Sequence, residues 1–250
     1  PYNTALYDMR QIGREFLSSR KQTFIAYLEQ SDAVLHVQGR AESIRFLEQL
    51  DLFLQDLQQQ VSARTGRKLL IDVVSDHGST LEHGLFVDLN KHLNDCGFNR
   101  NNRIAKPNDV AYTLAGIIGS AAVTARPESV TQVAQRMAGI EGVGLVAVDR
   151  GDRVLILSDD GSKAEIWPAT GNAEAYIYKT LVGDPLHLLP AKTTSPAQIR
   201  FLEADVFRQT VDHVYPDPLR RLWRAFHGAV QMPSPILVSL KDGYEVANRT

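Results

Sequence analysis

Residues 68 to 78 read Lys68-Leu-Leu-Ile-Asp-Val-Val-Ser-Asp-His-Gly78, a run of apolar and β-branched residues that ends in a polar tetrapeptide. Such a run is typical of a β-strand that is buried on both of its faces. The tetrapeptide that begins at Ser75 then lies at the carboxyl end of that strand. Strands buried on both faces belong mainly to parallel sheets, so this stretch favours an α/β fold.

The sequence upstream of this stretch predicts a second strand and a crossover helix. The strand is Thr23-Phe-Ile-Ala-Tyr-Leu28, and Asp32 follows its end. Between the two strands, Ser43 can cap a helix that Gly66 stops. Apolar side chains recur along this helix every three or four residues, at Leu47, Leu50, Leu54, Leu57 and Val61. Because the order is strand, helix, strand, we expect a largely parallel central sheet flanked by helices.

Each predicted strand is followed by a carboxylate and an imidazole. Asp32 and His36 stand in Tyr27-Leu-Glu-Gln-Ser-Asp-Ala-Val-Leu-His-Val-Gln-Gly39, and Asp76 and His77 stand in the tetrapeptide after the other strand. Mixed nitrogen and oxygen ligands suit zinc, and also manganese or iron, whereas oxygen ligands alone favour magnesium or calcium. Because side chains at the carboxyl ends of parallel strands gather at one edge of a sheet, we expect these two clusters to converge.

The composition narrows the classes of function. The chain has 250 residues, of which 44% are hydrophobic and 22% are charged, as in ordinary globular proteins. Its formal net charge of −2 gives no electrostatic reason to bind nucleic acid as a structural partner. Cys96 is the only cysteine, so the chain forms no internal disulfide and no thiolate cluster. No apolar run approaches the roughly 18 to 20 residues that a membrane-spanning helix needs.

The rest of the chain predicts a smaller α+β region and a return to the main sheet. Pro127 can open a helix whose apolar face is Val130, Val133, Ala134 and Met137. Three strand-like runs near 143–148, 153–158 and 163–167 are separated by turn sequences, which favours a meander. Helices are predicted from Ser195 to about Val211 and from Leu219 to His227, and a last strand is predicted from Pro235 to Leu240.

Taken together, the two clusters resemble the alkaline phosphatase superfamily, in particular its type I phosphodiesterase and nucleotide pyrophosphatase branch. In that branch a strand leads to Asp-x-x-x-His-x-x-Gly, a helix crosses, and the next strand ends in Ser-Asp-His-Gly. The resemblance covers about residues 23 to 80 and returns near Ile236 to Tyr244, while residues 97 to 230 match no motif of the family.

The resemblance implies an enzyme that hydrolyses phosphodiester, nucleotide or phosphomonoester bonds with two divalent metal ions, most commonly zinc, held about 4 Å apart. Carried over by position, Asp32 and His36 would bind one ion, and Asp76 and His77 would bind the other. The hydroxyl nucleophile, a Ser or Thr, is expected before Pro1, and a last histidine ligand is expected after Thr250. Residues 1–250 are therefore expected to be inactive alone and to bind metal weakly.

The resemblance also implies one partial alkaline phosphatase-like domain over residues 1–250. In this interpretation residues 1–96 carry the metal ligands, 97–190 form an inserted α+β subregion, and 191–250 return to the core. Both ends of the chain look cut, since it begins at Pro1. The sequence does not decide whether the protein is cytoplasmic or exported.

Several alternatives remain open at this point. The parent protein could be a phosphoglycerate mutase-like or sulfatase-like relative, or an inactive member that serves in binding or as a scaffold. Asp88 and His92 have the same spacing as Asp32 and His36, but the stretch Leu85 to Leu93 predicts an amphipathic helix with both on its exposed face. His83 is expected to be a loop histidine.

Overall fold

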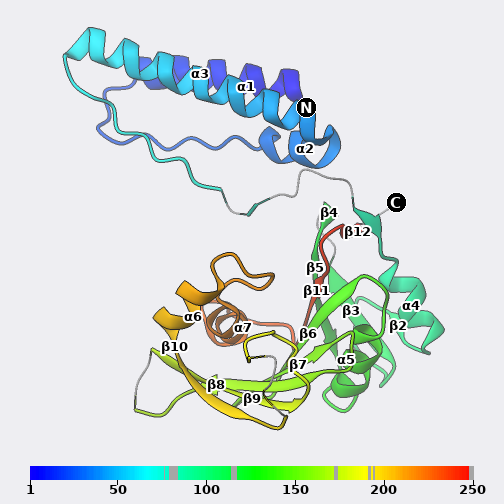
Figure 1. The fold of residues 1–250 in the computed structure, drawn as a ribbon. Helices are drawn as coiled ribbons and strands as arrows, with labels where there is room; N and C mark the ends of the chain where they lie inside the picture. The colour runs from blue at the N-terminus through cyan, green and yellow to red at the C-terminus, as the bar shows by residue number, and fades with distance from the viewer. Residues whose placement is uncertain are drawn as a thin grey trace. The chain divides into compact units, whose positions relative to one another are not determined.

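A computed structural model gives the fold of two compact units, Pro1–Gly84 and Leu85–Thr250 (Figure 1). It describes residues 1–75, 77–78, 84–113, 117–171, 174–190, 193 and 195–247, and the side chains of residues 35, 36, 113, 117 and 247 lie outside this description. Among the described residues, no helix is both long enough and apolar enough to cross a membrane.

Unit 1 is built from three helices, α1 (Tyr2–Ser18), α2 (Gln30–Val37) and α3 (Gly39–Thr65). Figure 1 shows α1 and α3 side by side, and α2 packs against both. The buried side chains between them form a small apolar core of Ala5, Met9, Val34 and Phe46. The helix predicted before Gly66 is confirmed, but Ser43 does not cap it, because the helix begins at Gly39 and the Ser43 hydroxyl donates to the carbonyl oxygen of Gly39 inside it. Gly66 ends it in the left-handed conformation, with a φ of 65° that few other residues adopt.

The two strands predicted in unit 1 are wrong. Residues 23–28 and 68–74 contain no strand, and they expose large apolar side chains to solvent. Ile25 is 91% exposed and Val74 is 88% exposed. The physical reason is that a strand needs a hydrogen-bonded neighbour, and none of the described residues of unit 1 forms a ladder with either segment.

Unit 2 contains a nine-stranded sheet, in the order β10-β9-β8-β7-β6-β11-β5-β3-β2, and a three-stranded sheet, β1-β12-β4. The elements of unit 2, in chain order, are β1 (Leu85–Phe86), α4 (Leu89–Asp95), β2 (Asn99–Arg100), β3 (Asp109–Thr113), β4 (Ile117–Ile118), β5 (Ser120–Ala125), α5 (Val130–Ala138), β6 (Val143–Asp149), β7 (Val154–Ser158), β8 (Lys163–Pro168), β9 (Ala175–Val182), β10 (Gln198–Leu202), α6 (Glu203–Thr210), α7 (Pro218–His227), β11 (Ile236–Leu240) and β12 (Tyr244–Ala247).

The fold class is a mixture of α and β, as predicted, but the prediction of a largely parallel sheet is wrong. In the large sheet only the pair β2 and β3 is parallel, and the pairs from β3 through β10 are antiparallel. The reason is local, because β6, β7 and β8 are joined by short turns. A short turn reverses the chain and can only bring antiparallel strands together.

The large sheet carries an apolar core on each face. Along β6, Val146 and Val148 belong to one buried cluster, while Leu145 and Ala147 belong to the other. Because alternate residues of a strand point to opposite faces, these clusters lie on opposite sides of the sheet. Helix α5 packs in the first cluster, and α6 and α7 pack in the second. Figure 1 shows the helices on the two sides of the sheet.

Several predictions for unit 2 are confirmed. The predicted apolar face of the helix after Pro127 is buried in α5, and the three strands of the meander are β6, β7 and β8. Strand β11 matches the predicted last strand and lies inside the sheet between β5 and β6. The helix predicted from Ser195 is wrong over its first part, where residues 198–202 form β10, and α6 covers only residues 203–210.

Candidate metal centre

Asp32 lies in the first turn of α2. A carboxylate at this position is favourable because the amino end of a helix carries a partial positive charge. The turn that precedes the helix is closed by Ser31, whose backbone N–H and Oγ both donate to the carbonyl oxygen of Leu28, and by the N–H of Asp32, which donates to Glu29. These bonds fix the backbone from which the Asp32 side chain extends, and that side chain is 55% exposed.

His77 lies in a bend beyond the segment 68–75, which has no regular secondary structure. Its Nδ1 lies 2.9 Å from the carbonyl oxygen of Gly78, and the Ser75 hydroxyl donates to the carbonyl oxygen of His77. A carbonyl oxygen can only accept, so the proton of this bond belongs to Nδ1. The remaining ring nitrogen, Nε2, is therefore the one that can face a metal ion, as in many histidine ligands.

The structure brings Asp32 and His77 together, although they are far apart in the sequence. The Nε2 atom of His77 lies 3.3 Å from Oδ1 of Asp32, and the His77 side chain is 49% exposed. Both residues belong to unit 1. A member of each predicted cluster thus reaches a shared position at the surface of this unit.

The other two predicted ligands lie outside the description of the structure. The backbone of His36 is part of α2, but its side chain is not described, and neither is Asp76. His83 also lies outside the described residues. In the part of the chain that is described, no group of three or more His, Cys, Asp or Glu side chains could hold a metal ion. The donor types of the contact, a carboxylate oxygen and an imidazole nitrogen, fit a zinc-type ion.

Of the pair with the same spacing, Asp88 and His92, Asp88 has a structural role. Asp88 is the cap of α4, where its Oδ1 accepts from the N–H of Lys91 at 2.9 Å. The helix begins at Leu89, so the prediction that a helix spans Leu85 to Leu93 is wrong at its start, where Leu85 and Phe86 form β1. The capping carboxylate is already used by the helix, and Asp88 and His92 are both half-buried, so the prediction of an exposed face for them is wrong.

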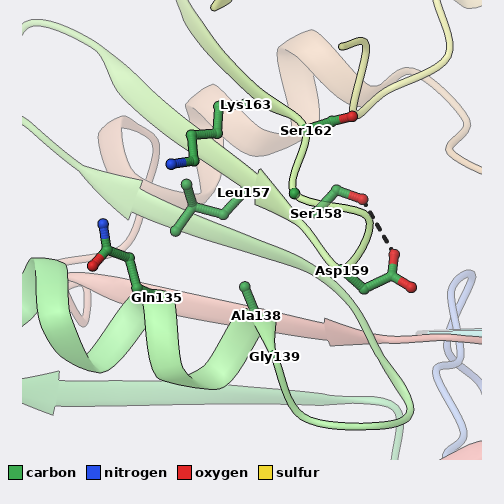
Figure 2. Close-up of a pocket in the computed structure, with 9 residues that line it drawn as sticks. Gln135, Ala138, Gly139, Leu157, Ser158, Asp159, Ser162 and Lys163 are labelled. Carbon is green, nitrogen blue, oxygen red and sulfur yellow. Dashed lines mark hydrogen bonds between the residues drawn. The ribbon is translucent and has the colours of Figure 1, made fainter. Parts of the chain in front are cut away.

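Unit 2 contains an open cavity of about 330 Å³ between the end of α5 and the turn that joins β7 and β8 (Figure 2). The Asp159 carboxylate on its rim accepts from the Ser158 hydroxyl and pairs with Lys241. The hydrogen bond from Lys241 is the main reason that the pKa of Asp159 is lowered. Because this carboxylate is already neutralised by an ammonium group, the cavity offers less to a metal ion than the contact in unit 1.

Sequence reasoning did not predict two clusters in unit 2 that contain histidines. The rings of His187, His213 and Tyr215 lie with centroids 6.2 to 6.4 Å apart, and His187 borders a second cavity of about 510 Å³. His227 stacks on Trp223 at 3.8 Å, and its Nε2 lies 3.4 Å from Oδ1 of Asp149. Trp223 and His227 are neighbours on one helix, but the contacts of His187 with His213 and of His227 with Asp149 join separate elements, so no sequence spacing predicts them.

Comparison with known families gives one match. The profile of the family described as type I phosphodiesterase / nucleotide pyrophosphatase matches residues 3–160. Neither the comparison with curated proteins nor the comparison with solved structures gave a match. The matched range contains both clusters and more than half of the chain. The chain therefore belongs to the type I phosphodiesterase / nucleotide pyrophosphatase family, a branch of the alkaline phosphatase superfamily.

Proposed function

We propose that this chain is the metal-binding part of a hydrolase that cleaves phosphodiester, nucleotide or phosphomonoester bonds at a two-metal site. The observation that carries the proposal is the family match over residues 3–160, because members of this family act on small phosphate esters or nucleotides. The 3.3 Å contact between Asp32 and His77 supports it, since it joins the two clusters that the resemblance assigns to metal.

The proposed ligands are Asp32, His36, Asp76 and His77, and the proposed ions are two divalent cations, zinc above all. When bound, the ions would activate a hydroxyl nucleophile and stabilise the negative charge that develops on the phosphate. The chain's own contribution is to hold the donors. The carbonyl oxygen of Gly78 fixes the proton of His77 on Nδ1, and the first turn of α2 holds the Asp32 carboxylate.

The finer parts of the proposal concern the nucleophile and the architecture. We place the Ser or Thr nucleophile outside residues 1–250, as the family pattern implies. We also propose an alkaline phosphatase-like arrangement for the protein, which the family match supports.

The division into residues 1–96, 97–190 and 191–250 remains a prediction of this proposal. A sulfatase-like or phosphoglycerate mutase-like activity, or a binding role without catalysis, is the competing hypothesis. The three enzyme types differ in nucleophile and substrate, so substrate choice distinguishes them.

The test uses a polypeptide that extends this chain upstream until it includes the expected nucleophile. Hydrolysis of a chromogenic phosphodiester is compared with that of a phosphomonoester and a sulfate ester, with and without chelator. We expect phosphoester hydrolysis that the chelator abolishes and that Asp76→Ala reduces by at least about tenfold, since even the loss of groups that only support a ligand costs this much. Asp88→Ala, which removes a carboxylate from a helix cap, is the matched control.

Hydrolysis of the sulfate ester alone would favour the sulfatase-like hypothesis. Absence of hydrolysis, together with absence of bound transition metal in protein purified without chelator, would favour the binding role and remove the enzyme proposal.

A further inference from the structure

The large sheet ends in two edge strands of different length. One edge is β2, which has two residues, and the other is β10, which has five (Figure 1). Strand β10 contains no proline, and it pairs with β9 without a bulge. Short strands, prolines and bulges are common features that keep an edge from pairing with another chain. Because β10 has none of these features, its outer edge can accept a further strand.

The hydrogen bonds at the two ends of β10 show which of its backbone groups face outward. The N–H of Thr180 donates to the carbonyl oxygen of Ala197, and the N–H of Glu203 donates to the carbonyl oxygen of Glu174. Both bonds fit the register of β10 with β9, so the odd-numbered residues of β10 bond to β9. Because bonded and non-bonded pairs alternate along an antiparallel ladder, the backbone groups of the even-numbered residues point away from β9. Among the described residues, no strand pairs with this outer edge.

The side chains of β10 make its two faces different. Ile199 and Phe201 are half-buried, and Phe201 packs against the buried cluster of α6 and α7. Gln198, Arg200 and Leu202 are exposed on the opposite face of the strand. A strand added at this edge would therefore meet apolar side chains on one face and the charge of Arg200 on the other. Such an edge fits a partner strand whose apolar and polar residues alternate in the same way.

The charges near this edge favour a negative partner. Arg200 lies in the middle of β10, and Lys179 lies on β9 opposite Gln198, on the same face. Glu165 is opposite Lys179 on β8, but its carboxylate pairs with Arg153 at 3.2 Å. Within the part of the chain that the structure describes, neither Arg200 nor Lys179 forms an ion pair. An exposed cation beside outward backbone donors fits a carboxylate on an added strand.

The same charge disfavours a second copy of this chain as the partner. Two copies of β10 that pair antiparallel about the middle of the strand would set Arg200 opposite its own counterpart. Like charges directly opposite each other destabilise a strand pair, whereas opposite charges stabilise it. The charge at the centre of β10 therefore selects against self-pairing and in favour of an acidic strand.

We propose that β10 is a docking edge for an extended, acidic segment of another protein, which adds as a further strand of the large sheet. The backbone of that segment bonds to Gln198 and Arg200, and one of its carboxylates lies opposite the Arg200 side chain. This inference does not depend on the metal site of the proposed function, because all of its residues belong to unit 2.

The experiment follows the backbone amides of residues 1–250 by NMR while a peptide is added. The peptide is short and capped at both ends, and valine alternates with threonine except at its centre, where glutamate replaces a threonine. We expect this peptide to shift the amide resonances of Gln198 and Arg200, which face the free edge. A second peptide with lysine at the centre should bind at least about threefold more weakly, because its charge repels Arg200.

Two substitutions separate the charge of the edge from its backbone. Arg200→Glu should reverse the preference, so that the lysine peptide binds more tightly than the glutamate peptide. Gln198→Pro keeps the charge and removes one outward N–H, so it should weaken the binding of both peptides. An edge strand tolerates proline where the missing N–H faces solvent. Arg136→Glu makes the same charge change on α5, which packs against β6 and β7, and should leave both affinities unchanged.

Several outcomes would overturn the inference. Equal binding of the two peptides, or an unchanged preference in Arg200→Glu, would show that the charge does not select the partner. Amide shifts that leave β10 unaffected would place the peptide elsewhere. Shifts of β10 that grow with protein concentration in the absence of peptide would identify a second copy as the partner. None of these results bears on the proposed function, which is tested by hydrolysis and metal content.

Discussion

Both units contain sequences that favour strands, but only those in unit 2 form them. In unit 1, the apolar segments 23–28 and 68–74 form no strand and expose large apolar side chains, while in unit 2 the apolar strand β6 is paired on both edges and covered on both faces. Ile25 is 91% exposed, whereas Ile156 of the neighbouring strand β7 is 0% exposed. Composition therefore marks where a strand can form, and the available neighbours decide whether it does.

The largest effect is expected from the core of unit 1, which is small. Phe46 is 1% exposed, and its replacement by alanine should cost about 3–5 kcal/mol. Because few other buried apolar side chains hold the three helices together, Phe46→Ala should unfold unit 1 and reduce the helical signal in far-UV circular dichroism. Ile44→Ala, at a 42% exposed position of the same helix, is the control. Equal helical signals in both variants would show that this core does not hold unit 1.

A second prediction compares the two isoleucines directly. Ile156→Ala should lower the free energy of unfolding by about 2–5 kcal/mol, because it leaves a cavity between packed side chains. Ile25→Ala should change it by less than about 0.5 kcal/mol, because the side chain lies in water in residues 1–250. Chemical denaturation measures both. A comparable loss in the two variants would mean that segment 23–28 is buried in solution.

A third prediction concerns acid stability in unit 2. The backbone N–H of Lys106, the side chain of Asn101 and the N–H of Ala105 all donate to the Asp109 carboxylate and hold its pKa below the usual range. The unfolded chain has an Asp pKa of about 3.9, so the stabilisation is complete above that pH and is lost as pH falls through the lower folded value.

Asp109→Asn should therefore be less stable than the wild type at pH 7, and the difference should shrink as the pH falls below about 4. Urea denaturation at a series of pH values measures this difference. A difference that stays constant over the whole range would mean that the hydrogen bonds do not favour the charged form.

Local patterns predicted much of the fold. The spacing of apolar residues predicted α3 and α5, and Gly66 predicted the end of α3. The first part of the helix predicted from Ser195 failed although an alternating pattern was present, since Ile199 and Phe201 are less exposed than their neighbours in β10. Apart from the meander of β6, β7 and β8, the antiparallel sheet was not predicted, because the pairing of β11 with β5 and β6 depends on residues far away in the sequence.

The candidate site remains a prediction, and it has a different basis. The clusters around Asp32 and His77 were found from their residue types and their family pattern, and the structure brings these two side chains together. The expected route to this contact, a pair of parallel strands, is absent from the described residues of unit 1. In contrast, the contact of His227 with Asp149 has no local pattern and could only be seen in the structure.

The most direct test of the metal site is the amount of zinc that residues 1–250 bind at equilibrium dialysis, compared with two double variants. Asp32→Ala with His77→Ala removes the contact, and Asp88→Ala with His92→Ala removes a pair of the same residue types from α4. We predict that the first double variant loses zinc binding and that the second retains the binding of the wild type. Equal zinc binding by the wild type and both variants would contradict the assignment of Asp32 and His77 to a metal site.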